Sequence, residues 1–238
     1  MAAAVLSRYL IVTMALVSLA AETIEPINDL RIGVTVQMSP TISEVIAPET
    51  GEAKRYNWEG GKSWGLRYDL LYVHGSAPHG RPQSGLLWAI GGSYGDTKNT
   101  PSRYDVGNGT ADNTRQDIEL QYRQYGGTLG LGWASLPTDT ELGDFHWEIL
   151  ALGRAGVAKA QTVAPGLRAA RGDGDGFYWE AGPTLGMALT SRDWIFGVNV
   201  GWTYGRSSIG IDLPSNSTST LTVIRNGAEG GAQIGYRF

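Results

Sequence analysis

The chain has 238 residues, including 34 glycines and no cysteine, and its formal net charge at pH 7 is −4. The absence of cysteine excludes a disulfide framework, a thiolate metal site and a cysteine nucleophile, and the mild charge without a basic run excludes a nucleic-acid surface. Glycine is about twice its usual share of roughly 7% and is scattered through apolar and aromatic runs, which indicates crowded or sharply curved strands.

The first segment has the layout of a secretory signal. Arg8 precedes the apolar run "YLIVTMALVSLA", which ends in small residues that suit cleavage after Ala20 or Ala21. We therefore expect residues 1–21 to be a cleaved signal peptide and residues 22–238 to form the mature domain. A short signal anchor is the alternative, although the run is shorter than the roughly 20 residues that span a bilayer.

Eight later segments alternate between apolar and polar residues with the period of two that is typical of strands. In the first of them, "LRIGVTVQMS", the residues from Leu30 to Met38 alternate cleanly. The predicted strands cover residues 30–39, 63–73, 85–95, 115–136, 145–157, 177–189, 194–205 and 221–238.

Two features of these strands leave alternatives open. In residues 115–136, Ile118 and Tyr122 lie on the parity opposite to that of Leu129. A bulge near Gly126 and Gly127 would bring the apolar residues of both halves to one side of the strand. The alternative is that the outer half lies above a membrane, where apolar side chains need not all face the same side. Pro183 lies inside another strand, where proline usually marks a bulge or an edge.

The apolar face of the strands carries many large aromatic residues, and this predicts which way it points. An eight-stranded barrel has an interior just wide enough for side chains, so these rings would overfill it, as they would in a soluble barrel of the lipocalin kind. We therefore expect them to face lipid. An aromatic girdle is predicted at Trp64, Trp133, Phe145 and Trp194.

The opposite face consists of glycine and charged residues, which we expect to point into the lumen. Both signs of charge are present, and buried charges require partners. The predicted polar network of the lumen contains Arg31, Arg67, Asp69, Glu148, Arg154, Glu180, Arg225, Glu229 and Arg237.

The links between strands alternate between long and short, as in outer-membrane barrels with longer external loops and short periplasmic turns. An even strand number then places both termini in the periplasm and four long loops outside. We predict an all-β fold, an eight-stranded antiparallel up-and-down transmembrane β-barrel.

The ending "IGYRF" resembles the C-terminal sorting signature of bacterial outer-membrane β-barrels, carried here by Ile234, Tyr236 and Phe238. With the signal peptide, the strands and the loops, nearly the whole mature chain resembles the small OmpA/OmpX-type barrels. The resemblance implies a Gram-negative outer membrane, with lipid and lipopolysaccharide as neighbours and assembly by the barrel-assembly machinery. No OmpA-like peptidoglycan-binding domain follows the predicted barrel, which argues against that family's tethering role.

Two functions fit this pattern. The first is a structural or surface-interaction protein with a filled lumen. The alternative is a narrow, porin-like channel for ions or small solutes, because the inward glycines leave gaps. We expect a monomer without a cofactor or a metal, and the sequence identifies no external ligand.

An enzyme is a distant alternative, and we expect none. His74 and His79 fall in a predicted periplasmic turn, and His146, with Glu148 on its own face, begins a strand at the periplasmic end. Enzymes among such barrels act at the outer leaflet or the outer rim.

Other short motifs carry little weight. The loop "RGDGDG", with the tripeptide Arg171 to Asp173, fits chance in a glycine-rich chain, and Asp173 and Asp175 lack the remaining ligands of a calcium site. The glycosylation patterns at Asn108 and Asn216 have no default meaning in a bacterial outer membrane.

Overall fold

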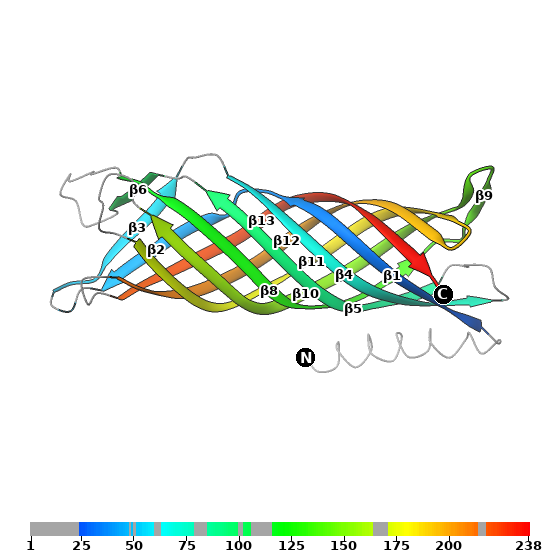
Figure 1. Cartoon of the computed structure of the whole chain (residues 1–238), viewed down its shortest axis with the longest axis horizontal. Helices are drawn as coiled ribbons and strands as arrows, with labels where there is room; N and C mark the ends of the chain where they lie inside the picture. Colours follow the sequence, from blue (N-terminus) through cyan, green and yellow to red (C-terminus); the bar gives the residue numbers. More distant parts are fainter. Residues whose placement is uncertain are drawn as a thin grey trace, which may run out of the picture.

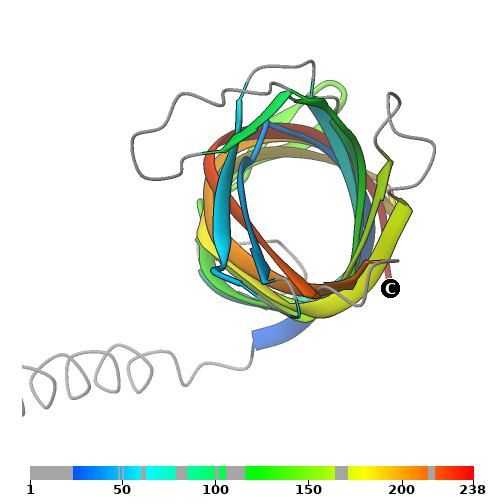
Figure 2. The same ribbon diagram turned by 90° about the vertical axis from the view of Figure 1, so that its left-hand side faces the viewer.

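The computed structural model describes residues 24–47, 49, 51–59, 63–78, 85–99, 102–105, 116–163, 171–213 and 218–238. The described chain is all-β, and eight antiparallel strands form a closed ring in which the last strand pairs with the first (Figures 1 and 2). This confirms the predicted fold class. The ring strands are β1 (Ile24–Gln37), β4 (Ser63–Pro78), β5 (Gly85–Asn99), β8 (Glu119–Ala134), β10 (Gly143–Val163), β11 (Arg171–Ser191), β12 (Trp194–Asp212) and β13 (Thr218–Arg237).

The pairing register fixes the slant of the barrel. A row of hydrogen-bonded partners that starts at Trp147 on β10 passes once around the ring and returns to β10 at Val157. The rows are thus displaced by ten residues per circuit. With about 3.3 Å per residue and about 4.8 Å between strands, this displacement tilts the strands by about 40° from the barrel axis.

At the end of the barrel away from the chain termini, which we call the outer end, the strands extend further than the sequence predicts. The predicted polar links at residues 40–61 and 96–114 contain much of a second set of strands, which continues the wall beyond β1, β4 and β5. β2 follows β1 along β13, and β3, β6 and β7 then pair in turn (Figure 1). These elements are β2 (Thr41–Ala47), β3 (Lys54–Glu59), β6 (Ser102–Asp105) and β7 (Gln116–Asp117).

The register also resolves the ambiguity in β8. This strand pairs with β5 and β10 without a shift from Leu120 to Ala134, so no bulge occurs at Gly126 and Gly127. Leu120 and Tyr122 point inward and are buried, in the outer part of the barrel. This rules out the bulge and agrees with the second alternative, since the apolar side chains of β8 face the exposed wall near Leu129 and the interior near Tyr122.

Pro183 marks neither a bulge nor an edge. β11 keeps one register with β12 on both sides of this residue, and the ladder omits only Gly182 and Pro183. On its other side Pro183 pairs with Ala151 of β10.

The two halves of the barrel have opposite polarity. In the outer half an apolar core fills the interior, whereas in the other half the exposed wall is apolar and charged side chains share the interior with a second apolar cluster. The outer core consists of Ile42, Trp58, Ile118, Leu120, Tyr122, Ala158, Ala160, Tyr178, Ile209, Ile211, Leu221 and Val223.

β1 begins and β13 ends at the same end of the barrel, opposite β2, β3 and β6 (Figure 1). Phe238 donates its main-chain N–H to the carbonyl oxygen of Asn28 at 3.0 Å, and Leu30 pairs with Tyr236. The short link at residues 137–144 contains a further strand, β9 (Thr138–Thr140), which forms a hairpin with the start of β10. No helix in the described part of the chain is long and apolar enough to cross a membrane.

Candidate functional site

The lumen contains two networks of buried ions. In the network nearer the termini, Arg31 on β1 makes a two-pronged contact with Glu148 on β10, with nitrogen–oxygen distances of 2.6 and 2.8 Å. Arg31 also donates to Asp29 at 2.8 Å, and Glu148 pairs with the Nε2 of His146 at 2.8 Å. Arg237 joins Asp29 at 2.8 Å, so the network links the first and last strands.

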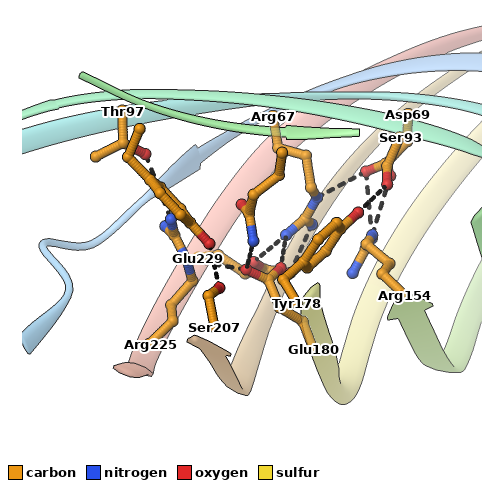
Figure 3. Close-up of polar contacts among 12 residues, drawn as sticks. Arg67, Asp69, Ser93, Thr97, Arg154, Tyr178, Glu180, Ser207, Arg225 and Glu229 are labelled. Atoms are coloured by element: carbon orange, nitrogen blue, oxygen red, sulfur yellow. Dashed lines mark hydrogen bonds and ion pairs between the residues drawn. The ribbon is translucent and has the colours of Figure 1, made fainter. Parts of the chain in front are cut away.

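The central network is built around Arg67 on β4 (Figure 3). Its two terminal nitrogens donate to the carboxylate of Glu229 at 2.8 Å each, and its Nε donates to Asp69 at 3.0 Å. Asp69 also accepts from Arg154 at 3.0 and 3.2 Å. Together with Glu180 on β11, these charged side chains come from four strands of the ring (β4, β10, β11 and β13), so the network crosses the lumen.

The remaining charged pair lies next to Arg67. The Nε of Arg225 is 3.1 Å from Glu180, which also accepts from Gln124 at 2.7 Å. Glu180 lies 3.8 Å from Arg67, and Arg225 donates to Thr97 at 3.3 Å.

Positive and negative charges in the two networks balance. The structure places all nine residues of the predicted polar network inside the barrel or, for Arg237, at its end. The sequence analysis missed Asp29, although it lies two residues before Arg31 on the same face. The balanced set is Arg31, Arg67, Arg154, Arg225 and Arg237 with Asp29, Asp69, Glu148, Glu180 and Glu229.

Little space remains between these side chains. A cavity of about 40 Å³ lies between the networks, lined by Arg67, Leu71, Glu148 and their neighbours. A water molecule needs roughly 10–15 Å³ of such space, so this cavity has room for only a few water molecules. Two clusters of buried apolar side chains fill other parts of the interior. One is the outer core, and the other consists of Leu71, Val73, Leu87, Ala89, Ala134, Leu150 and Leu152.

Tyr122 and Tyr178 form the boundary between the charged interior and the outer core. Tyr122 shares a hydrogen bond with Ser207, and burial raises the pKa of its hydroxyl above the usual range, so the group stays neutral. The hydroxyl of Tyr178 lies 3.2 Å from that of Ser93, across the lumen (Figure 3).

The exposed wall has an aromatic row at each border of an apolar belt. On β12 every second side chain from Trp194 to Tyr204 is apolar and about half exposed, and Arg206 follows. At the tilt derived above, the ten steps from Trp194 to Tyr204 rise about 25 Å, which is the height of the apolar band of outer-membrane barrels.

The row nearer the termini includes two residues of the predicted girdle, Trp133 and Trp194, which point outward. Phe145 is half-buried and packs edge-on against Trp147, with ring centroids 5.8 Å apart. The side chain of Trp64 lies outside the described residues.

The sequence analysis did not place the tyrosines of the outer row in the girdle. Tyr68, Tyr94 and Tyr125 form part of it, with ring centroids 6.1 and 5.2 Å apart. A charged residue two positions further out, such as Arg123 beside Tyr125, is the signal that marks this border in the sequence.

The residues considered for catalysis or adhesion lie in different parts of the fold. His146 and Glu148 are buried, and no group of metal-ligating side chains occurs in the part of the chain that the structure describes. The tripeptide at residues 171–173 was predicted to lie in a loop, but it is the paired start of β11. His79, Asn108 and Asn216 lie outside the described residues.

Comparison with known proteins finds similarity in structure and none in sequence. No protein-family model and no curated protein matches the sequence. Among solved structures, the chain is similar to the outer membrane protein OprG from Pseudomonas aeruginosa, with 14% identity over 90% of this chain and 95% of that one and a TM-score of 0.40. It is also similar to the outer membrane protease OmpT from Escherichia coli (9% identity, 92% and 99% covered, TM-score 0.45).

A third similar structure is Ail, the attachment invasion locus protein of Yersinia pestis, with 14% identity, 88% and 99% covered and a TM-score of 0.26. By its own closed ring, its charged lumen and its apolar belt, this chain has the fold of a small outer-membrane β-barrel.

Proposed function

We propose that this protein is an integral outer-membrane barrel of the bacterial cell envelope whose filled lumen makes it an anchor and not a pore. The observation that carries the proposal is the balanced ion network around Arg67, which crosses the lumen and fills it together with two apolar clusters. The belt of about 25 Å supports the membrane location. Outer-membrane lipid and lipopolysaccharide are its proposed neighbours, with the barrel-assembly machinery as its proposed route of insertion.

The outer half gives the barrel a second role, as a rigid stalk. β12 continues beyond Tyr204 to Asp212, which adds about 20 Å above the belt at the same tilt. An apolar core fixes these extended strands, so their outer ends stand clear of the lipid head groups. We propose a monomer that presents these strand ends at the cell surface for a structural or surface-interaction role, without a catalytic function.

Recordings in planar bilayers test the filled lumen. We expect little or no single-channel current from the folded protein. The matched control is a variant with Arg67→Gly and Arg154→Gly, in which two large side chains no longer cross the lumen; it should conduct more. Sustained large openings of the unmodified protein would instead favour the narrow channel.

Cysteine labelling on intact cells tests the orientation, because the natural chain contains no cysteine. Thr220→Cys, on the exposed face of the outer half of β13, should react with a membrane-impermeant maleimide. Arg192→Cys, in the exposed turn before β12 at the other end, should react only after the outer membrane is opened. The reverse pattern would contradict the proposed topology.

A further inference from the structure

The hairpin that contains β9 leaves the end of the barrel with two exposed leucines. Leu142 is 73% exposed and Leu136 is 61% exposed. The hairpin is nevertheless well fixed. Ser135 exchanges two hydrogen bonds with Trp147, at 2.8 and 2.9 Å, and Thr140 donates to the carbonyl of Gly143 at 2.6 Å.

Gly143 holds the hairpin close to the barrel. Its φ of +136° is a conformation that favours glycine, and a side chain here would collide with the main chain of Thr190 at the end of β11. The exposed leucines are therefore presented in a defined position beside β11 and are not on a loose loop.

A groove of about 740 Å³ separates the hairpin tip from the barrel wall. Leu142 lines it on the hairpin side, and mainly apolar residues line it on the wall side, among them Phe145, Met187, Leu189, Phe196 and Val198. Phe196 and Val198 directly follow Trp194 in the outward row of β12, so the groove opens into the belt on its periplasmic side.

The position of the groove indicates what fills it. Its wall belongs to the surface that faces hydrocarbon, so a soluble protein segment would have to displace lipid to enter. Arg192 is exposed in the turn that joins β11 to β12, two residues from Trp194 at the edge of the belt. In the proposed membrane this edge meets the lipid phosphates. An acyl chain along the wall with its phosphate near Arg192 satisfies both features.

We infer that this groove binds one acyl chain of a phospholipid of the periplasmic leaflet, with Leu142 inserted beside that chain. The hairpin would then act as an inner-leaflet anchor. The inference rests on the proposed membrane location and deepens it by naming a lipid site.

Quenching by lipids brominated in their acyl chains tests this inference in vesicles that contain the full chain. Single cysteines replace Leu142 at the groove, Leu129 in the belt away from the hairpin, and Asp139 on the polar part of the hairpin, and each carries an environment-sensitive dye. We expect the labels at positions 142 and 129 to lose fluorescence in brominated vesicles and the label at position 139 to keep it.

The label at position 129 distinguishes failure of the proposed membrane location from failure of the proposed lipid site. If it is quenched while the label at position 142 is not, the barrel is inserted and the lipid site is wrong. If neither is quenched, the membrane location fails, and the lipid site fails with it. The third outcome combines two measurements on the cysteine at position 142. If its dye stays unquenched in vesicles, yet the unlabelled cysteine is shielded from maleimide in cell envelopes, the groove would be assigned to a protein partner.

Native mass spectrometry of detergent-extracted protein gives a second readout. Leu142→Asp should retain less bound phospholipid than the unmodified protein, whereas Leu136→Asp, on the other arm of the hairpin and outside the groove, should retain as much. Equal retention in all three proteins would overturn the inference.

Discussion

At the scale of single residues, the lumen depends on charges that are stable only in pairs. Removing two ions from water costs several kcal/mol each, and their attraction compensates for this cost only when the geometry is good and further hydrogen bonds are made. Arg67 meets both conditions, because it donates to Glu229 and to Asp69 at the same time.

Removing the central arginine should therefore destabilise the barrel strongly. Arg67→Met leaves Glu229 buried without its partner, and we expect a loss of about 3–5 kcal/mol in the free energy of unfolding. The double variant Arg67→Met with Glu229→Met should recover most of this loss. Urea titration of tryptophan fluorescence measures both, and a double variant as unstable as the single one would show that the pair is not the unit of stability.

A glycine next to Tyr178 provides a second test at this scale. A side chain at Gly126 would overlap the Tyr178 hydroxyl and the main-chain carbonyl of Ala155, whereas Gly127 has space. We expect Gly126→Ala to cost about 1–3 kcal/mol, the usual penalty of overpacking, and Gly127→Ala to cost much less. The temperature at which the compact form disappears on an unboiled detergent gel should fall only for the first variant, and equal shifts would contradict this account.

At the scale of the strands, the barrel reverses polarity along its length. The belt half buries charge and exposes apolar side chains, and the outer half does the opposite. This is the arrangement expected if lipid surrounds the first half and water the second, as proposed above. Leu221 is fully buried in the outer core, while its neighbour Thr220 faces outward.

Leu221→Ala should loosen the outer half selectively. Loss of a buried leucine costs about 2–5 kcal/mol, and here the loss falls on the packing of β13 against β2 and β3. Hydrogen exchange should quicken at the amides of β2 and β3 and stay unchanged at those of β1 in the belt. Thr220→Ala is the matched control, and uniform quickening along the barrel would indicate that the two halves unfold as one unit.

The strands of the belt could be predicted because lipid on one side and packed charge on the other impose a strict period of two. β2 could not, because its sequence "TISEVIA" places Ile42 and Glu44 together on the inward face. Glu44 is tolerated there because Trp58 and Ser219 donate to it at 3.3 and 2.6 Å. Both partners lie on other strands, so the local pattern gives no sign of them.

The same reason limits prediction of the lumen. Inward-facing charges follow from alternation, but their partners follow from the closure of the ring. Arg31 and Glu148 are 117 positions apart, and only the staggered register brings them together. The groove beside β9 depends likewise on how a short hairpin sits against distant strands.

At the scale of the whole molecule, closure joins the two ends of the described chain. Phe238 makes one main-chain hydrogen bond to Asn28, and its ring lies 5.5 Å from that of Tyr236 but is 70% exposed. The residue therefore contributes little burial to the finished barrel, although it completes the row that resembles a sorting signature.

Deleting Phe238 should separate assembly in cells from stability in the test tube. We expect less barrel in the outer membrane with export unimpaired, because the proposed signature at Ile234, Tyr236 and Phe238 loses its last aromatic residue. The same variant refolded in detergent should still migrate as a compact form before boiling, because it loses one hydrogen bond. Phe238→Tyr, which keeps the ring, is the control. Unchanged outer-membrane levels after the deletion would rule out the sorting role, and failure to refold in detergent would show that Phe238 acts through stability instead.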